Sequence, residues 1–156
     1  MLIEKDKRGI ELQLLYSDEN FSVPANVYII GMMNTADRSL AMLDYALRRR
    51  FSFFTMKPGF NAPGFQAYQD SLKSDDFNKL IACVKQLNSK IAEDISLGEG
   101  FCIGHSYFCS LTPETANTQT LSSIVEYELI PLLKEYWFDE PANVIDWGDR
   151  LRSAVK

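Results

Sequence analysis

One segment constrains the fold of this chain more than any other. The run from Val27 to Met33, Val-Tyr-Ile-Ile-Gly-Met-Met, is continuously apolar and rich in β-branched residues. Such runs are typical of strands buried on both faces, usually in a parallel sheet covered by helices. Helical spacing of leucines then predicts a helix over 38–49, and a second short strand is expected over 51–54. The strand–helix–strand order predicts an α/β fold.

The residues before this run predict smaller elements. Residues 2–8 are typical of the tail of a helix that ends before Gly9. Ile10, Leu12 and Leu14 alternate with polar residues, and a return strand over 21–23 predicts a hairpin. A buried parallel strand needs neighbours on both edges, and this chain offers few candidates. We therefore expect an incomplete sheet, with its other strands supplied by residues upstream of this chain.

After Pro58-Gly59 the pattern becomes helical. One helix is expected around Phe65–Leu72, and a long apolar stripe at 3.6-residue spacing, from Phe77 to Ile95, predicts a second. A third is expected over 121–133, with Pro131 kinking it or starting a new segment, and a final helix over 141–155. The expected organisation is an α/β part over 1–58 and a mainly helical part over 59–156.

Composition excludes several classes of protein. The longest apolar run is far shorter than the ~20 residues of a membrane span, and no apolar signal core follows the first charged residues. The three cysteines form no Cys-x-x-Cys pair, and there is one histidine, so neither a disulfide framework nor a metal site is expected. The formal net charge of −5 argues against a free-standing nucleic-acid binder. We expect a cytoplasmic protein that does not associate with membranes.

The residues most able to carry chemistry lie at the two ends of the expected helix over 38–49. The buried strand would deliver Asn34 to its carboxyl end, where open α/β sheets bind ligands. Arg48, Arg49 and Arg50 could stabilise the charge that develops in phosphoryl transfer. Other interpretations stay open: Asn34 as a helix cap, arginines favoured by the helix dipole, and an ion pair between Asp44 and Arg48.

The same segment resembles the sensor-1 strand, the following helix and the arginine-finger region of AAA+ proteins. Met33-Asn34-Thr35-Ala36-Asp37-Arg38-Ser39 resembles in particular the Asn-Thr-Ala-Asp signature of the McrB branch, the GTPase subunits of modified-cytosine restriction systems. The resemblance continues through Leu-Arg-Arg-Arg-Phe, through 100–109 and through 130–139. It therefore covers nearly the whole chain and implies the C-terminal part of an AAA+ module, with the last core strands and a helical lid.

The resemblance implies roles for residues at matching positions. Asn34 would be sensor 1, which positions the attacking water, and Asp37 would complete the signature. Arg49 or Arg50 would act in trans as the arginine finger. The residues expected near the nucleotide are Thr35, Arg48, His105 and Ser106. His105 stands in the sensor-2 region where many AAA+ proteins carry arginine, and its alternative is a turn histidine whose bonds are satisfied within the fold.

Two motifs of nucleotide hydrolysis are missing from this sequence. A phosphate-binding loop needs Gly-x-x-x-x-Gly-Lys-Ser/Thr, and no glycine here precedes a lysine. No apolar strand ends in a metal-binding acidic pair, since Trp137-Phe138-Asp139-Glu140 follows a helical stretch. In the family both motifs lie upstream, so the chain is interpreted as a fragment that does not hydrolyse nucleotide alone.

The resemblance also implies cofactors and partners for the complete protein. These are GTP, or ATP as the second choice, with Mg²⁺; a ring of copies, expected to be a hexamer; an McrC-type nuclease subunit; and DNA bound through a domain absent here. No tightly bound cofactor is expected on this chain. Two other functions remain: a helical interaction module that docks onto a motor or nuclease subunit, and DNA binding by the arginine cluster, which the net charge disfavours.

Overall fold

The computed structural model describes residues 2–33 and 45–156, in two compact units, Met1–Thr55 and Met56–Lys156. The greater part of the helix expected over 38–49 lies outside the described residues. So do Asn34, Thr35, Asp37 and Asp44. Each unit has its own local structure.

The first unit contains only short elements of secondary structure among its described residues. It contains a 3₁₀ turn η1 (Lys5–Lys7), strands β1 (Leu12–Gln13) and β2 (Asn20–Phe21), and helix α1 (Tyr45–Arg48). The strands pair antiparallel, with Leu12 opposite Phe21, which confirms the expected hairpin. The tail of a helix expected over 2–8 is reduced to η1. None of the described side chains of this unit is buried, so the unit has no apolar core among them.

The two strands expected at 27–33 and 51–54 are not formed, and this part of the sequence interpretation was wrong for the chain as it stands. Both segments lack strand structure, and their side chains are largely exposed, with Ile30 at 92% and Phe54 at 89%. A strand exists only where a neighbour pairs with its backbone, and in the described residues β1 and β2 pair solely with each other. Local apolar pattern cannot supply that neighbour.

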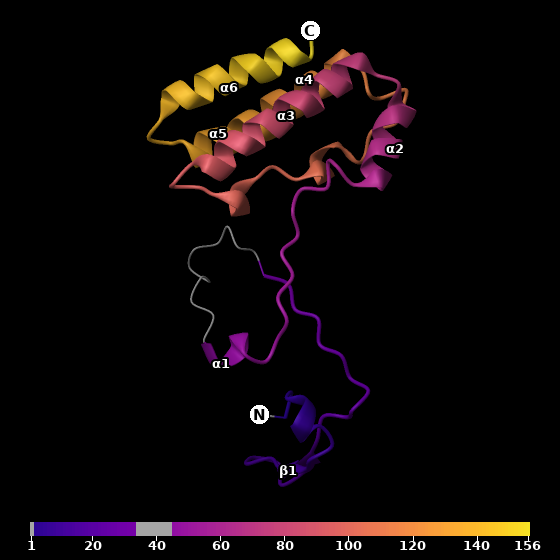
Figure 1. Cartoon of the computed structure of the whole chain (residues 1–156), viewed down its shortest axis with the longest axis vertical. Coiled ribbons are helices and arrows are strands. Elements are labelled where there is room, and N and C mark those ends of the chain that lie inside the picture. Colours follow the sequence, from indigo (N-terminus) through magenta and orange to yellow (C-terminus); the bar gives the residue numbers. More distant parts are fainter. Residues whose placement is uncertain (1, 34–44) are drawn as a thin grey trace. The chain divides into compact units, whose positions relative to one another are not determined.

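The second unit is a helical bundle, seen in the upper part of Figure 1. Its α-helices are α2 (Pro63–Leu72), α3 (Asp75–Glu93), α4 (Thr118–Ile124), α5 (Ile130–Tyr136) and α6 (Pro141–Ala154). The connections include 3₁₀ turns η3 (Glu99–Phe101) and η4 (His105–Phe108), and a π-helical turn η5 (Val125–Leu129) joins α4 to α5. Helix α6 packs along α3 and α5. The expected helices of this part are therefore confirmed.

Helix α3 is the centre of the bundle because the apolar side chains along one of its faces are buried. The side chains of Phe77, Leu80, Val84, Leu87 and Ile91 are all buried. Ser74 caps the helix by accepting a hydrogen bond from the Phe77 N–H. Ile95, which the spacing placed at the end of this stripe, is fully exposed instead. The helix ends at Glu93 and Asp94 turns to extended backbone, so the periodicity no longer applies two residues later.

Pro131 begins a new helical segment, one of the two outcomes that the sequence allowed. Proline offers no N–H and cannot continue an ordinary α-helical hydrogen-bond ladder. The chain widens into the π turn η5 just before it, and the Ile130 N–H bonds to the Val125 carbonyl five residues back. Pro131 then lies in the first turn of α5, where its missing donor costs little.

The core of this unit includes Phe108, Trp137 and Leu151 as well as the α3 stripe. The one polar side chain buried among the described residues, Asn88 of α3, donates from Nδ2 to the Ile103 carbonyl at 2.9 Å and accepts at Oδ1 from its N–H at 2.7 Å. This pairing fastens the loop between η3 and η4 to the bundle. None of the described helices has the length and apolar character needed to cross a bilayer.

Candidate functional site

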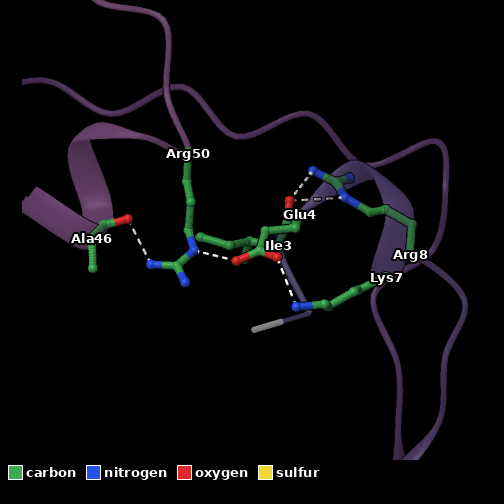
Figure 2. Close-up of polar contacts among 6 residues, drawn as sticks. All are labelled: Ile3, Glu4, Lys7, Arg8, Ala46 and Arg50. Atoms are coloured by element: carbon green, nitrogen blue, oxygen red, sulfur yellow. Dashed lines mark hydrogen bonds and ion pairs between the residues drawn. The ribbon is translucent and has the colours of Figure 1, made fainter.

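The arginine cluster at 48–50 begins at the last residue of the short helix α1, and Arg50 binds groups of this chain itself. Its Nε donates to the Glu4 carboxylate, and its Nη1 donates to the Ala46 carbonyl at 2.6 Å (Figure 2). Glu4 also pairs with Lys7, 2.8 Å away. The hydrogen bonds from Lys7 and then from Arg50 lower the pKa of the Glu4 carboxyl to about 2. Arg50 is therefore a fixed, partly shielded cation that links Glu4, the residue before η1, to Ala46 of α1.

The other two arginines differ from Arg50. The Arg48 guanidinium carbon lies 5.9 Å from the centroid of the Phe53 ring, an exposed cation–π contact. Arg49 is exposed, and no carboxylate of the described residues lies within ion-pair distance of it. Consecutive residues point in different directions, which explains the three separate environments. Arg49 is thus the member best placed to meet a group outside this chain.

Arg49 and Arg50 also line a recess of the first unit. Its lining includes the basic residues Lys5 and Arg8, with Glu4 as the acidic member. Guanidinium and ammonium groups bind phosphate and carboxylate through charge-assisted hydrogen bonds. The arrangement can attract an anion, and its one carboxylate, Glu4, is already paired with Lys7 and Arg50.

His105 lies in the second unit, where η4 begins. Its Nδ1 accepts a hydrogen bond from the Gly59 N–H at 3.0 Å. Its ring meets Phe60 and Phe65 edge to face, with centroids 6.2 and 5.7 Å away. Ser106 follows it on the same turn and is exposed. The interpretation of His105 as a turn histidine therefore holds for Nδ1, whose hydrogen bond is satisfied within the fold. Nε2 has no hydrogen-bond partner among the described residues.

The structure brings the predicted site residues together in two separate sets. Arg48, Arg49 and Arg50 belong to the first unit, and His105 with Ser106 to the second. Sequence reasoning missed the partners of both sets. Glu4, which binds Arg50, is 46 positions away, and Gly59, which binds His105, is also 46 positions away. No local pattern could have identified Glu4, whereas Pro58-Gly59 was visible as a break between the two parts.

The described residues do not form a metal site. They contain no group of three or more histidine, cysteine, aspartate or glutamate side chains suited to hold an ion. The chemistry that they offer is that of cationic donors, together with the imidazole and hydroxyl of η4.

Comparison with known proteins defines the class of the helical unit. The alpha-helical lid domain of McrB matches residues 79–145, which run from α3 into α6. The greater part of the second unit is therefore similar to a lid domain of the McrB type.

The whole chain is similar to one curated subunit in particular. It is 48% identical over 161 aligned positions to the type IV methyl-directed restriction enzyme EcoKMcrB subunit of Escherichia coli (strain K12), covering 97% of this chain and 35% of that protein. It is 32% identical over 91 positions to the type II restriction enzyme BsuMI component YdiS of Bacillus subtilis (strain 168), covering 54% of this chain and 26% of that one. The chain spans about a third or less of each relative. The predicted relation to McrB-type subunits is confirmed.

Proposed function

We propose that this chain is the C-terminal part of an AAA+ nucleoside-triphosphatase module that drives a modified-DNA restriction endonuclease. The observation that carries the proposal is the 48% identity to the EcoKMcrB subunit over 97% of the chain, with an McrB-type lid at residues 79–145. In this proposal residues 1–58 complete the α/β core and 59–156 form the lid. The exposed runs at 27–33 and 51–54 become strands when the rest of the core pairs with them.

The proposal assigns each candidate residue a task. Asn34, supported by Asp37, orients the water that attacks the terminal phosphate, and Thr35 lies beside that phosphate. Arg49 reaches the nucleotide of a neighbouring copy and stabilises the charge that develops on the phosphate oxygens. Arg48 lies close to the same nucleotide. We assign the finger to Arg49 before Arg50, because Arg50 is already bound to Glu4.

His105 and Ser106 are the lid residues of the site in this proposal. Since Nδ1 of His105 accepts from Gly59, the ring proton belongs on Nε2, which can donate to a phosphate oxygen. The Ser106 hydroxyl is exposed on the same turn and offers a second donor.

The donor set of the described residues fits the outer oxygens of a triphosphate and fits Mg²⁺ poorly. Guanidinium, imidazole and hydroxyl groups are phosphate donors, whereas the described residues hold no carboxylate cluster for a metal. GTP is the proposed nucleotide and ATP the second choice; hydrolysis would release the terminal phosphate. Residues upstream of this chain would hold both the nucleotide and Mg²⁺, so the chain alone is proposed to bind neither tightly.

The proposed partners follow from the same relationship. They are further copies in a ring, six in number, an McrC-like nuclease subunit, and DNA bound through another part of the protein. The location proposed for this assembly is the cytoplasm.

The decisive experiment is Arg49→Ala in a protein that joins this chain to the upstream nucleotide-binding half. A finger supplied in trans accelerates hydrolysis roughly 10³-fold or more, so kcat should fall by about that factor while nucleotide affinity changes little. Arg150→Ala is the matched control, because Arg150 is an exposed arginine that covers the Trp147 ring, 4.7 Å from its centroid. Unchanged hydrolysis in Arg49→Ala would exclude Arg49 as the finger. Turnover by the isolated chain would contradict the proposed division of labour.

The alternative function is a helical interaction module that docks onto a motor or nuclease subunit. It is favoured by the fact that every buried apolar residue among the described ones belongs to the second unit, which has a complete core. This alternative predicts that Arg49→Ala and Arg50→Ala weaken partner binding and leave basal hydrolysis intact.

A further inference from the structure

The approach of His105 to Gly59 leaves no room for a side chain at position 59. A Cβ atom placed on Gly59 would lie 2.9 Å from Cε1 of the imidazole and 3.2 Å from both ring nitrogens. Cβ contacts below about 3.0 Å do not occur without displacement, so the ring and the backbone amide require glycine here. The contact is thus a close fit between a backbone and a ring that lie far apart in the sequence.

The same stretch of chain is held to the helical unit at two further points. Lys57 pairs with Glu99, with Nζ and Oε1 3.0 Å apart. Phe60 is buried, with 3% of its surface exposed, and its ring contacts Phe65 at a centroid distance of 5.3 Å. The Lys57–Glu99 pair is exposed and contributes little. The stretch from Lys57 to Phe60 therefore depends mainly on the Gly59 bond and on the burial of Phe60.

The two nitrogens of His105 have different tasks. Nδ1 accepts from a backbone N–H, and a neutral imidazole then carries its proton on Nε2. The rings of Phe60 and Phe65 restrict its rotation. Nδ1 is thereby used in a hydrogen bond within the fold, and the restricted ring holds Nε2 in one orientation.

We propose that Gly59 and His105 form a latch that fastens the segment Lys57–Phe60 to the helical unit. Gly59 also fixes the tautomer of His105, so each member is a positioning residue. When the helical unit moves, residues 57–60 move with it, and any hinge between the two units must lie before Lys57. This goes beyond the proposed nucleotide hydrolysis, which concerns Nε2 and not Nδ1.

Two substitutions at one position test the latch in the full chain. In His105→Asn the side-chain oxygen can take the place of Nδ1, whereas in His105→Gln the amide reaches the place of Nε2. Both remove the ring and keep a polar group of similar size. We expect the Gly59 amide to exchange its hydrogen roughly five to ten times faster in His105→Gln than in His105→Asn, as for the loss of one hydrogen bond. Equal exchange in the two variants would overturn the latch.

The unaltered chain provides a second test that needs no substitution. Nitrogen-15 NMR of the imidazole should show the proton on Nε2 at neutral pH, and the tautomer with its proton on Nδ1 would refute the geometry. Gly59→Ala should release the ring and lose that single tautomer, while the control Gly64→Ala should keep it, because a Cβ at Gly64 meets nothing within 4 Å.

The outcome is separable from that of the proposed function. Exchange at Gly59 and the tautomer are measured without nucleotide, so the latch can hold even if the chain has no part in hydrolysis. Conversely, normal nucleotide hydrolysis by the His105→Asn variant would show that His105 does not make the proposed phosphate contact, and it would leave the latch unaffected.

Discussion

The indole nitrogen of Trp137 donates a hydrogen bond to Oδ2 of Asp94 at 2.8 Å, which joins the end of α3 to the end of α5. The other oxygen of Asp94 accepts from the backbone N–H of Ser96 at 2.8 Å and from its hydroxyl at 2.6 Å. One carboxylate therefore serves a buried indole and the turn that stops α3. The stability that these contacts provide therefore depends on the ionisation of the Asp94 carboxyl.

We predict that acid weakens the second unit through Asp94. The Ser96 hydroxyl and then the Trp137 indole lower the pKa of its carboxyl from 3.8 to about 2 in the folded chain. Because the folded pKa is depressed, the stabilisation is fully present above about pH 4 and is lost as the pH falls towards 2. Asp94→Ala should lower the free energy of unfolding at neutral pH by about 2 kcal/mol and flatten its change between pH 4 and 2. Urea unfolding at a series of pH values measures both effects. The control is Asp139→Asn, which alters an exposed carboxylate in the turn after α5.

A second prediction concerns the buried amide of Asn88. Asn88→Ala leaves the N–H and the carbonyl of Ile103 without their partner in a buried place. Each unsatisfied group costs about 1–3 kcal/mol, so we expect a loss of roughly 3 kcal/mol in the free energy of unfolding. Ser89→Ala, the exposed neighbour on α3, should change it by less than about 0.5 kcal/mol. Equal losses in the two variants would show that the Asn88 pairing does not hold the loop.

Gly148 should behave in the opposite way to Gly59. It lies inside α6, where alanine favours the helix by about 0.5–1 kcal/mol over glycine. A Cβ there would lie 3.4 Å from Nη1 of Arg152, the end of a flexible side chain, and 3.8 Å from Ile130. Gly148→Ala should therefore raise the melting temperature of the second unit by roughly 2–8 °C. A decrease would mean that α6 packs against α5 too closely for one added methyl group.

The second unit should fold without the first. All of the buried apolar side chains among the described residues, from Phe60 to Val155, lie within it. We expect a chain of residues 56–156 to keep its helical circular dichroism and to unfold cooperatively in urea. Residues 1–55 alone should show no cooperative transition, because their described part buries no side chain. A second unit that needs residues 1–55 to fold would contradict this division.

Sequence alone determined the helices of the second unit and the relationship to McrB-type subunits. The spacing of Phe77, Leu80, Val84, Leu87 and Ile91 matches one face of a helix, and that face is the buried one. The hairpin of β1 and β2 was also predictable, since alternation and a turn are encoded within a dozen residues. In both cases the information lies in neighbouring residues.

The tertiary structure decided what depends on distant partners. Glu4 binds Arg50 and Gly59 binds His105 across 46 positions each, and no periodicity encodes such a pairing. The apolar run 27–33 also depends on a distant partner, and here that partner is missing among the described residues. Its composition favours a strand, yet a strand forms only when another backbone accepts and donates its hydrogen bonds, and the described residues provide no such neighbour for it.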